Sequence, residues 1–229
     1  MTARKPAPRW RGWLLLALVL PAAGMVFYEA QRLFRADWAS AATRHNVVQW
    51  VSGAAAPKSQ AEWDTAHADL QTSLRITPDD PNLHERLGDL HAVAGQRDWA
   101  DASLRRGHFT KAAAAYEQAT ALRPSEPGTW AMLAIARQAM GASGAPVHTA
   151  WARARALGPY EGHVQPMLMQ VVLADWDSAT PEMQAWAKAL FDAGNEGMRN
   201  DINTMARRHG LSFAPDPKPA AAAGSVPVP

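Results

Sequence analysis

Three prolines that each follow a stretch of helical sequence constrain the fold of this chain most. Pro78, Pro124 and Pro159 end segments in which a small residue lies four positions before a large apolar one. Proline lacks an amide proton and its ring clashes with the preceding turn, so each one closes a helix. A small side chain lets a neighbouring helix approach, and the large one fills the space beside it. The small and large residues are Ala66 and Leu70, Ala112 and Tyr116, and Val147 and Trp151.

A further helix is expected after each of the first two proline turns. Residues 82–95 (NLHERLGDLHAVAG) and 128–141 (GTWAMLAIARQAMG) share their spacing of apolar and small residues, and Gly95 corresponds to Gly141 as the glycine that ends the helix. This alternation of helix, glycine turn, helix and proline turn resembles the tetratricopeptide repeat. The resemblance implies an α-solenoid with a concave surface that binds another protein.

The repeats are irregular, and this limits where they can be placed. Between residues 87 and 107 the chain is about a dozen residues longer than one repeat allows, so residues 96–108 extend either a helix or a loop. The third copy is degenerate, with Pro146 where a helix would open. We place TPR-like helical repeats at 58–174. An unrelated helical bundle is the alternative.

The sequence after the repeats predicts a helical cap and a tail. Residues 175–212 contain two amphipathic stretches, and the first opens with Thr180, Pro181 and Glu182, which suit a helix start. Because the last repeat of a solenoid needs a covering element, we assign this region as C-terminal capping helices. Residues 213–229 are rich in Pro and Ala, and we expect a disordered tail there.

The N-terminal region predicts a membrane anchor. Residues 1–11 carry four basic side chains, whereas residues 12–28 carry no charge and have aromatic residues near both ends. The alternative is a signal peptide cleaved after small residues at 22–24. By the positive-inside rule, an anchor gives a single-pass inner-membrane protein with its N-terminus in the cytoplasm and its C-terminal domain in the periplasm. Residues 29–57 would form a helical connector.

Composition and motifs argue against several classes of chemistry. The chain has no Cys and a net charge of +2, which leaves no thiolate chemistry and no nucleic-acid footprint. It has no phosphate-binding glycine loop, Gly-x-Ser-x-Gly or His-Glu-x-x-His motif. The acidic pairs at 79–80 and at 175 and 177 suit turns and helix starts. We therefore assign no catalytic, cofactor-binding or metal-binding residue, and we expect a non-enzyme without cofactors.

The surface of the repeats is where a partner is expected. His84 and His91 lie two turns apart on one helix, too far to bind one metal ion directly, and Arg105 and Arg106 lie in a local basic patch. Six tryptophans at apolar helix positions are either core residues or an exposed face that stacks on sugars, namely Trp63, Trp99, Trp130, Trp151, Trp176 and Trp186. The residues predicted to contact a partner are His84, His91, Trp130, Arg137, Arg105 and Arg106.

A narrower resemblance suggests a biological setting. Residues 157–161 (LGPYE), together with Trp176 and the short N-terminal anchor, are similar to small membrane-anchored VpsP-like proteins of exopolysaccharide gene clusters. This implies a helper in exopolysaccharide synthesis or export. The sequence thus predicts an all-α protein in which a transmembrane helix precedes a TPR-like scaffold for protein–protein interaction. The alternatives are a periplasmic assembly factor for an envelope enzyme such as a cytochrome, and a carbohydrate-binding module.

Overall fold

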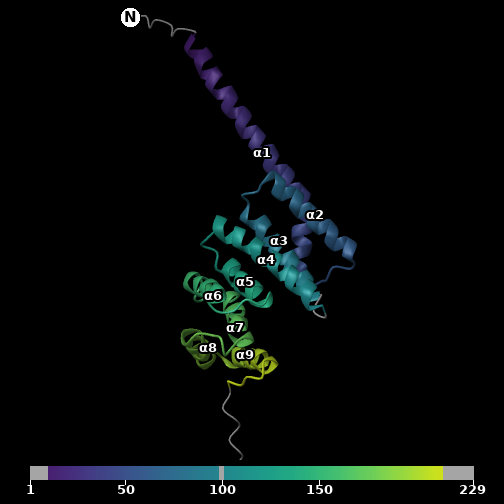
Figure 1. Ribbon diagram of the computed structural model, residues 1–229. Coiled ribbons are helices and arrows are strands. Elements are labelled where there is room, and N and C mark those ends of the chain that lie inside the picture. The colour runs from purple at the N-terminus through teal and green to yellow at the C-terminus, as the bar shows by residue number, and fades with distance from the viewer. Residues whose placement is uncertain (1–9, 98–100, 214–229) are drawn as a thin grey trace, which may run out of the picture. The chain divides into compact units, whose positions relative to one another are not determined.

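The computed structural model describes residues 10–97 and 101–213, with only the backbone of residues 10–16 (Figure 1). Within these ranges every regular element is an α-helix, which confirms the all-α prediction. The basic residues 1–9 and the tail 214–229 lie outside the described residues. The helices are α1 (Trp10–Val51), α2 (Gln60–Ile76), α3 (Pro81–Arg97), α4 (Ala102–Leu122), α5 (Pro127–Ala139), α6 (Ala145–Leu157), α7 (Val164–Ala174), α8 (Pro181–Ala193) and α9 (Glu196–Arg208).

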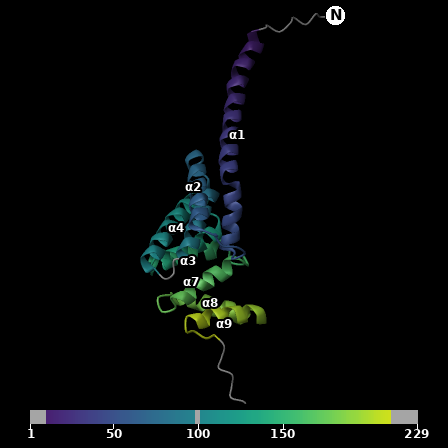
Figure 2. The ribbon, with the colours of Figure 1, turned by 90° about the vertical axis from the view of Figure 1, so that its right-hand side faces the viewer.

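The chain divides into two compact units, Met1–Leu90 and His91–Pro229, with the boundary inside α3. In the first unit, α2 lies alongside the C-terminal part of α1 (Figure 1 and Figure 2). Polar side chains take part in this contact, because the Ser73 hydroxyl of α2 donates 2.9 Å to the Ala36 carbonyl and Thr43 donates 2.8 Å to Asp69. Helix α3 is attached through Trp63, whose Nε1 donates 3.1 Å to the Leu90 carbonyl.

Helix α1 passes through the segment predicted as a transmembrane anchor at 12–28 and continues without a break into the predicted connector. Over the described part of the chain, none of the helices has both the length and the apolar character of a membrane span. In the sequence of α1, the charged residues Glu29 and Arg32 follow soon after the apolar stretch. The side chains of residues 12–16, which belong to the predicted anchor, lie outside the described residues.

The three proline turns share one backbone geometry. The residue before each proline caps its helix with φ between −128° and −134° and ψ between 60° and 76°. The amide of each capping residue donates 2.8–3.0 Å to the carbonyl of the small residue four positions earlier. The capping residues are Thr77, Arg123 and Gly158, and the small residues are Ser73, Ala119 and Ala154. The third copy, predicted to be degenerate, therefore keeps the turn of the other two.

A side chain from the following helix closes each turn in the same way. Six positions after the proline, a side-chain nitrogen donates to the proline carbonyl: His84 Nε2 at 2.7 Å, Trp130 Nε1 at 2.9 Å and Gln165 Nε2 at 3.1 Å. A carbonyl only accepts, so His84 carries its proton on Nε2 in this contact. Three different side chains thus donate the same hydrogen bond at one repeat position.

The extra residues in the middle of the chain lengthen a helix. Pro78 and Pro124 are 46 positions apart, whereas Pro124 and Pro159 are 35 apart, a difference of 11. Helix α4 has 21 residues against 13 in α6, which accounts for 8 of the 11. Asp101 caps the extended helix, with its carboxylate accepting from the amides of Ser103 and Leu104 at 2.9 and 3.0 Å. Pro146 is accommodated because α6 begins there, and proline fits the first turn of a helix.

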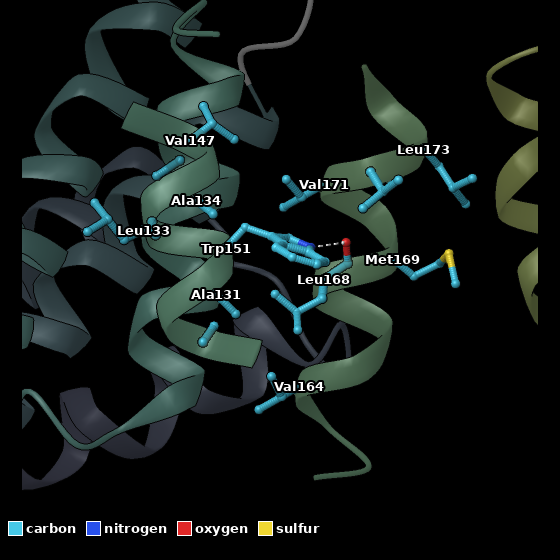
Figure 3. Packing of buried hydrophobic residues seen from close by; sticks show 14 of the residues in the cluster. Ala131, Leu133, Ala134, Val147, Trp151, Val164, Leu168, Met169, Val171 and Leu173 are labelled. Carbon is cyan, nitrogen blue, oxygen red and sulfur yellow. Dashed lines mark hydrogen bonds between the residues drawn. The ribbon is translucent and has the colours of Figure 1, made fainter. Parts of the chain in front are cut away.

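The core of the second unit lies between α4, α5, α6 and α7 and continues under α8 and α9. Trp151 of α6 is 1% exposed and reaches α7, where its Nε1 donates 3.2 Å to the Leu168 carbonyl (Figure 3). Alanines at buried positions of α4, α5 and α6 allow the helices to approach closely around this ring. Trp186 of α8 packs against Trp151 with the two rings nearly perpendicular and their centroids 5.3 Å apart, so the core continues to α8.

Gly95 was predicted to end its helix, and this is wrong, because α3 continues to Arg97. Gly95 and Gly107 are helical glycines that offer a matched test of the packing. A Cβ on Gly95 of α3 would lie 2.8 Å from the Phe109 ring of α4, whereas a Cβ on Gly107 of α4 would meet nothing within 4 Å. We expect Gly95→Ala to destabilise the protein by about 1–3 kcal/mol, because the ring must shift in a packed core. Gly107→Ala should instead stabilise it by about 0.5–1 kcal/mol through helix propensity. Urea unfolding followed by circular dichroism measures both changes, and equal effects would contradict the packing.

Candidate functional site

On the second unit, an apolar groove of about 690 Å³ lies between α7 and the α8–α9 corner. Met169 of α7 and Leu190 of α8 line one part of it. Helix α9 contributes Met198, Ile202 and Met205, which share one helix face because they are spaced by four and three residues. We call this site the α7–α9 groove. Its polar rim contains Gln165, Asn195, Asp201, Thr204 and Arg208.

The start of α9 orients the apolar wall of the groove. Asn195 caps α9, since its side-chain oxygen accepts 2.9 Å from the Met198 amide. Arg199 ties the helix back to α8 by donating 3.1 Å to the Phe191 carbonyl and 2.7 Å to the Asp192 carbonyl. Gly194 permits the tight corner, because a Cβ there would lie 3.0 Å from the Met198 sulfur. The corner is therefore held by bonds that leave the groove open.

The groove can adapt its shape to what it binds. Three of its apolar side chains are methionines, namely Met169, Met198 and Met205. Methionine is unbranched and polarisable, so it fits different apolar side chains without a fixed pocket shape. Met169 is fully buried, whereas Met198 and Met205 are half-buried at the opening. The arrangement suits binding of apolar side chains, with the polar side chains Asp201, Thr204 and Arg208 at its rim.

The residues predicted to contact a partner are dispersed over several structural roles. His84 and Trp130 use their ring N–H groups in the proline turns. Arg137 of α5 joins three helices, donating 2.8 Å to Glu117 of α4 and 2.7 Å to the Pro146 carbonyl of α6. For these three residues the structure shows an internal function, and their contact with a partner stays a prediction.

The remaining predicted residues lie on α3 and α4. His91 is 3% exposed, and its Nδ1 lies 3.3 Å from Nδ1 of His108, so one ring donates and the other accepts. Arg105 is half-buried and Arg106 is exposed on the first turns of α4. In the described ranges no three or more His, Cys, Asp or Glu side chains are grouped so as to hold a metal ion.

The tryptophans weighed as a sugar-binding face lie mostly inside the protein. Trp63 and Trp151 are buried and donate their ring N–H to backbone carbonyls. Trp130, Trp176 and Trp186 are half-buried against the core, and the Trp176 ring meets Phe213 edge-on at 5.4 Å. Trp99 lies outside the described residues. Trp63 and Trp151 are therefore core residues, whereas Trp130, Trp176 and Trp186 each pack one part of the ring against the core and keep another part exposed.

Comparison with known proteins supports the repeat. The family model described as tetratricopeptide repeat matches residues 93–136, which run from the end of α3 through α4 and most of α5. No curated protein and no solved structure matches the chain. Residues 93–136 are therefore similar to a tetratricopeptide repeat, a type of module that mediates protein–protein interaction. The resemblance to VpsP-like proteins finds no support in these comparisons.

Sequence reasoning missed the α7–α9 groove. It assigned the second amphipathic stretch of residues 175–212, which contains Ile202 and Met205, to covering the last repeat. In the structure Ile202 is buried, but Met198 and Met205 remain half-exposed at the groove. The signal that could have found the site is the length of the stripe, which Met198 extends by one turn toward the start of α9.

Arg137 can be tested for its internal role. We expect Arg137→Met to lower the free energy of unfolding by about 1–2 kcal/mol, because the Pro146 carbonyl loses its side-chain donor and α4 loses a link to α5. Arg153→Met on the exposed side of α6 serves as the control, with an expected change below about 0.5 kcal/mol. The denaturant concentrations at the unfolding midpoints of the two variants and of the unchanged protein are compared. An unchanged midpoint for Arg137→Met would mean that the residue is free to serve a partner instead.

Proposed function

We propose that this protein is a membrane-tethered, non-enzymatic scaffold whose repeat unit binds a helix of a partner protein in the α7–α9 groove. The observation that carries the proposal is an open groove lined by methionines at the end of a stack of tetratricopeptide-like helices. Tetratricopeptide repeats are interaction modules, and an exposed apolar groove with a polar rim is the usual form of a peptide-binding site.

The form of the partner segment follows from the walls of the groove. Helices α7 and α9 satisfy their backbone amides and carbonyls internally, so they offer no open strand edge on which an extended peptide could add. Recognition must then come from side chains. An amphipathic helix with two or three large apolar residues along one face fits these conditions. Asp201 and Arg208 on the rim would fix its register through opposite charges.

The tether is proposed from the exposed surface of α1. Seven large apolar side chains between residues 18 and 28 are 57–73% exposed. Such a surface is unfavourable in water, and a lipid environment would cover it. The uncharged residues 12–28 and the basic residues before them fit a single-pass anchor with the repeat unit on the periplasmic side.

The tether is tested by fractionation. We expect the full-length protein to stay in the membrane pellet after a carbonate wash, and a variant lacking residues 1–28 to appear in the supernatant, because the exposed apolar residues between 18 and 28 are then removed. Immunoblotting through a C-terminal tag follows both proteins. A full-length protein found in the supernatant would contradict the tether, and a retained shorter variant would locate membrane attachment elsewhere.

The groove is tested by co-purification. The tagged full-length protein is extracted gently, and the proteins that accompany it are identified by mass spectrometry. We expect Met205→Glu to lower recovery of a specific partner at least about tenfold, because a carboxylate would have to be buried beside apolar groups. The matched control is Asn200→Glu, which adds the same charge to the exposed side of α9. Equal recovery with both variants would contradict the groove as the docking site.

The setting of exopolysaccharide synthesis or export stays a hypothesis, and it rests on the short resemblance around residues 157–161. The same co-purification tests it. Groove-dependent recovery of polysaccharide synthesis or export proteins would support this setting. Groove-dependent recovery of cytochrome assembly proteins would support the alternative of an assembly factor and contradict the exopolysaccharide role.

A further inference from the structure

Helix α1 carries two mainly apolar stripes on opposite sides. One stripe is buried against α2 and the other is exposed; the two are centred roughly 160° apart around a helix that turns 100° per residue. Both alternate spacings of four and three residues. The buried stripe consists of Ala36, Ser40, Thr43, Val47 and Trp50, and the exposed stripe consists of Phe34, Trp38, Ala41, His45 and Val48.

The exposed stripe holds large side chains that the described fold does not cover. Phe34 is 64% exposed, Trp38 is 77% exposed and Val48 is 43% exposed. The rings of Phe34 and Trp38 stack on each other with centroids 6.0 Å apart and an interplanar angle of 29°. Aromatic side chains placed side by side on a helix surface indicate a contact site.

We propose that the exposed stripe of α1 pairs with the same stripe of a second copy as a parallel two-helix coil. Alternating spacings of four and three residues are the pattern of helices that wind around each other. A stripe that meets its own copy about a twofold axis is automatically complementary in register. The inference rests on the proposed function in one respect, since the tether holds two copies parallel and raises their local concentration.

The available area is consistent with a second copy. Phe34 and Trp38 together expose roughly 300 Å², taking a full aromatic side chain as about 150–250 Å². Ala41, His45 and Val48 bring the stripe to roughly 500 Å² per chain, so a pair would bury about 1,000 Å². This value is at the lower limit for a specific interface, and the membrane supplies the orientation that a free pair would lack.

The charged residues beside the exposed stripe permit a second α1 helix to approach closely. Asp37 and Arg44 lie on the same side of α1 and form an ion pair with each other. Because they neutralise one another within one helix, the flank of one copy does not repel the flank of the next. His45 is the polar member of the stripe, and a single polar residue at a core position helps to set the register of a coil.

The absence of cysteine from the chain allows a direct test. Single cysteines are introduced in the full-length protein at each position from 38 to 48, and disulfide formation in native membranes is measured after mild oxidation. We expect dimers to peak at positions 38, 41, 45 and 48. The matched pair is Ala41→Cys and Asn46→Cys, both exposed, with at least about tenfold more dimer for the first because only position 41 faces the partner helix.

The outcomes separate this proposal from the tether. Carbonate extraction of the same samples reports whether each variant is membrane-bound. Membrane-bound variants that form no dimer, or that form dimers equally at all positions, would overturn the pairing and leave the scaffold intact. Quenching by brominated lipid of a fluorophore on the Ala41→Cys variant, together with no dimer, would assign the stripe to the bilayer surface and also overturn the pairing.

Discussion

The hydrogen bond between each proline carbonyl and a side chain six residues further along the chain determines the shape of the repeats. Proline ends the helix, and its own carbonyl then faces the start of the next helix. A donor from that helix, His84, Trp130 or Gln165, fixes the angle between the two. Since the same bond occurs at three turns with nearly the same φ and ψ, successive helices leave their turns in the same direction.

Much of the helical arrangement could be predicted from the sequence because it depends on local chemistry. Pro78, Pro124 and Pro159 stop helices wherever they occur, and small residues at 73, 119 and 154 receive the capping bond at each turn. The length of α4 could not be predicted, because residues 96–108 have no strong break and either a loop or a helix satisfies them locally. Tertiary contacts of α4 with the rest of the second unit decide in favour of the helix.

The candidate site was harder to predict because it depends on how helices meet. His84 and Trp130 are residue types that often bind partners, so the sequence favoured a binding role. In the structure they instead donate to the Pro78 and Pro124 carbonyls across a turn, and this contact is not visible in the sequence. The α7–α9 groove exists because Gly194, Asn195 and Arg199 hold the α8–α9 corner at one angle. The sequence shows an apolar stripe on α9, but only the angle of the corner determines whether the stripe is covered.

The proposed scaffold would work by position rather than by chemistry. In the second unit, the α7–α9 groove would offer its methionines to the partner helix. The most direct test places a photoreactive benzoylphenylalanine at Met205 or, as a control, at Asn200 of the full-length protein in native membranes. The account predicts one defined crosslinked protein from position 205 and none from position 200. The same adducts from both positions, or none from either, would contradict docking in the groove.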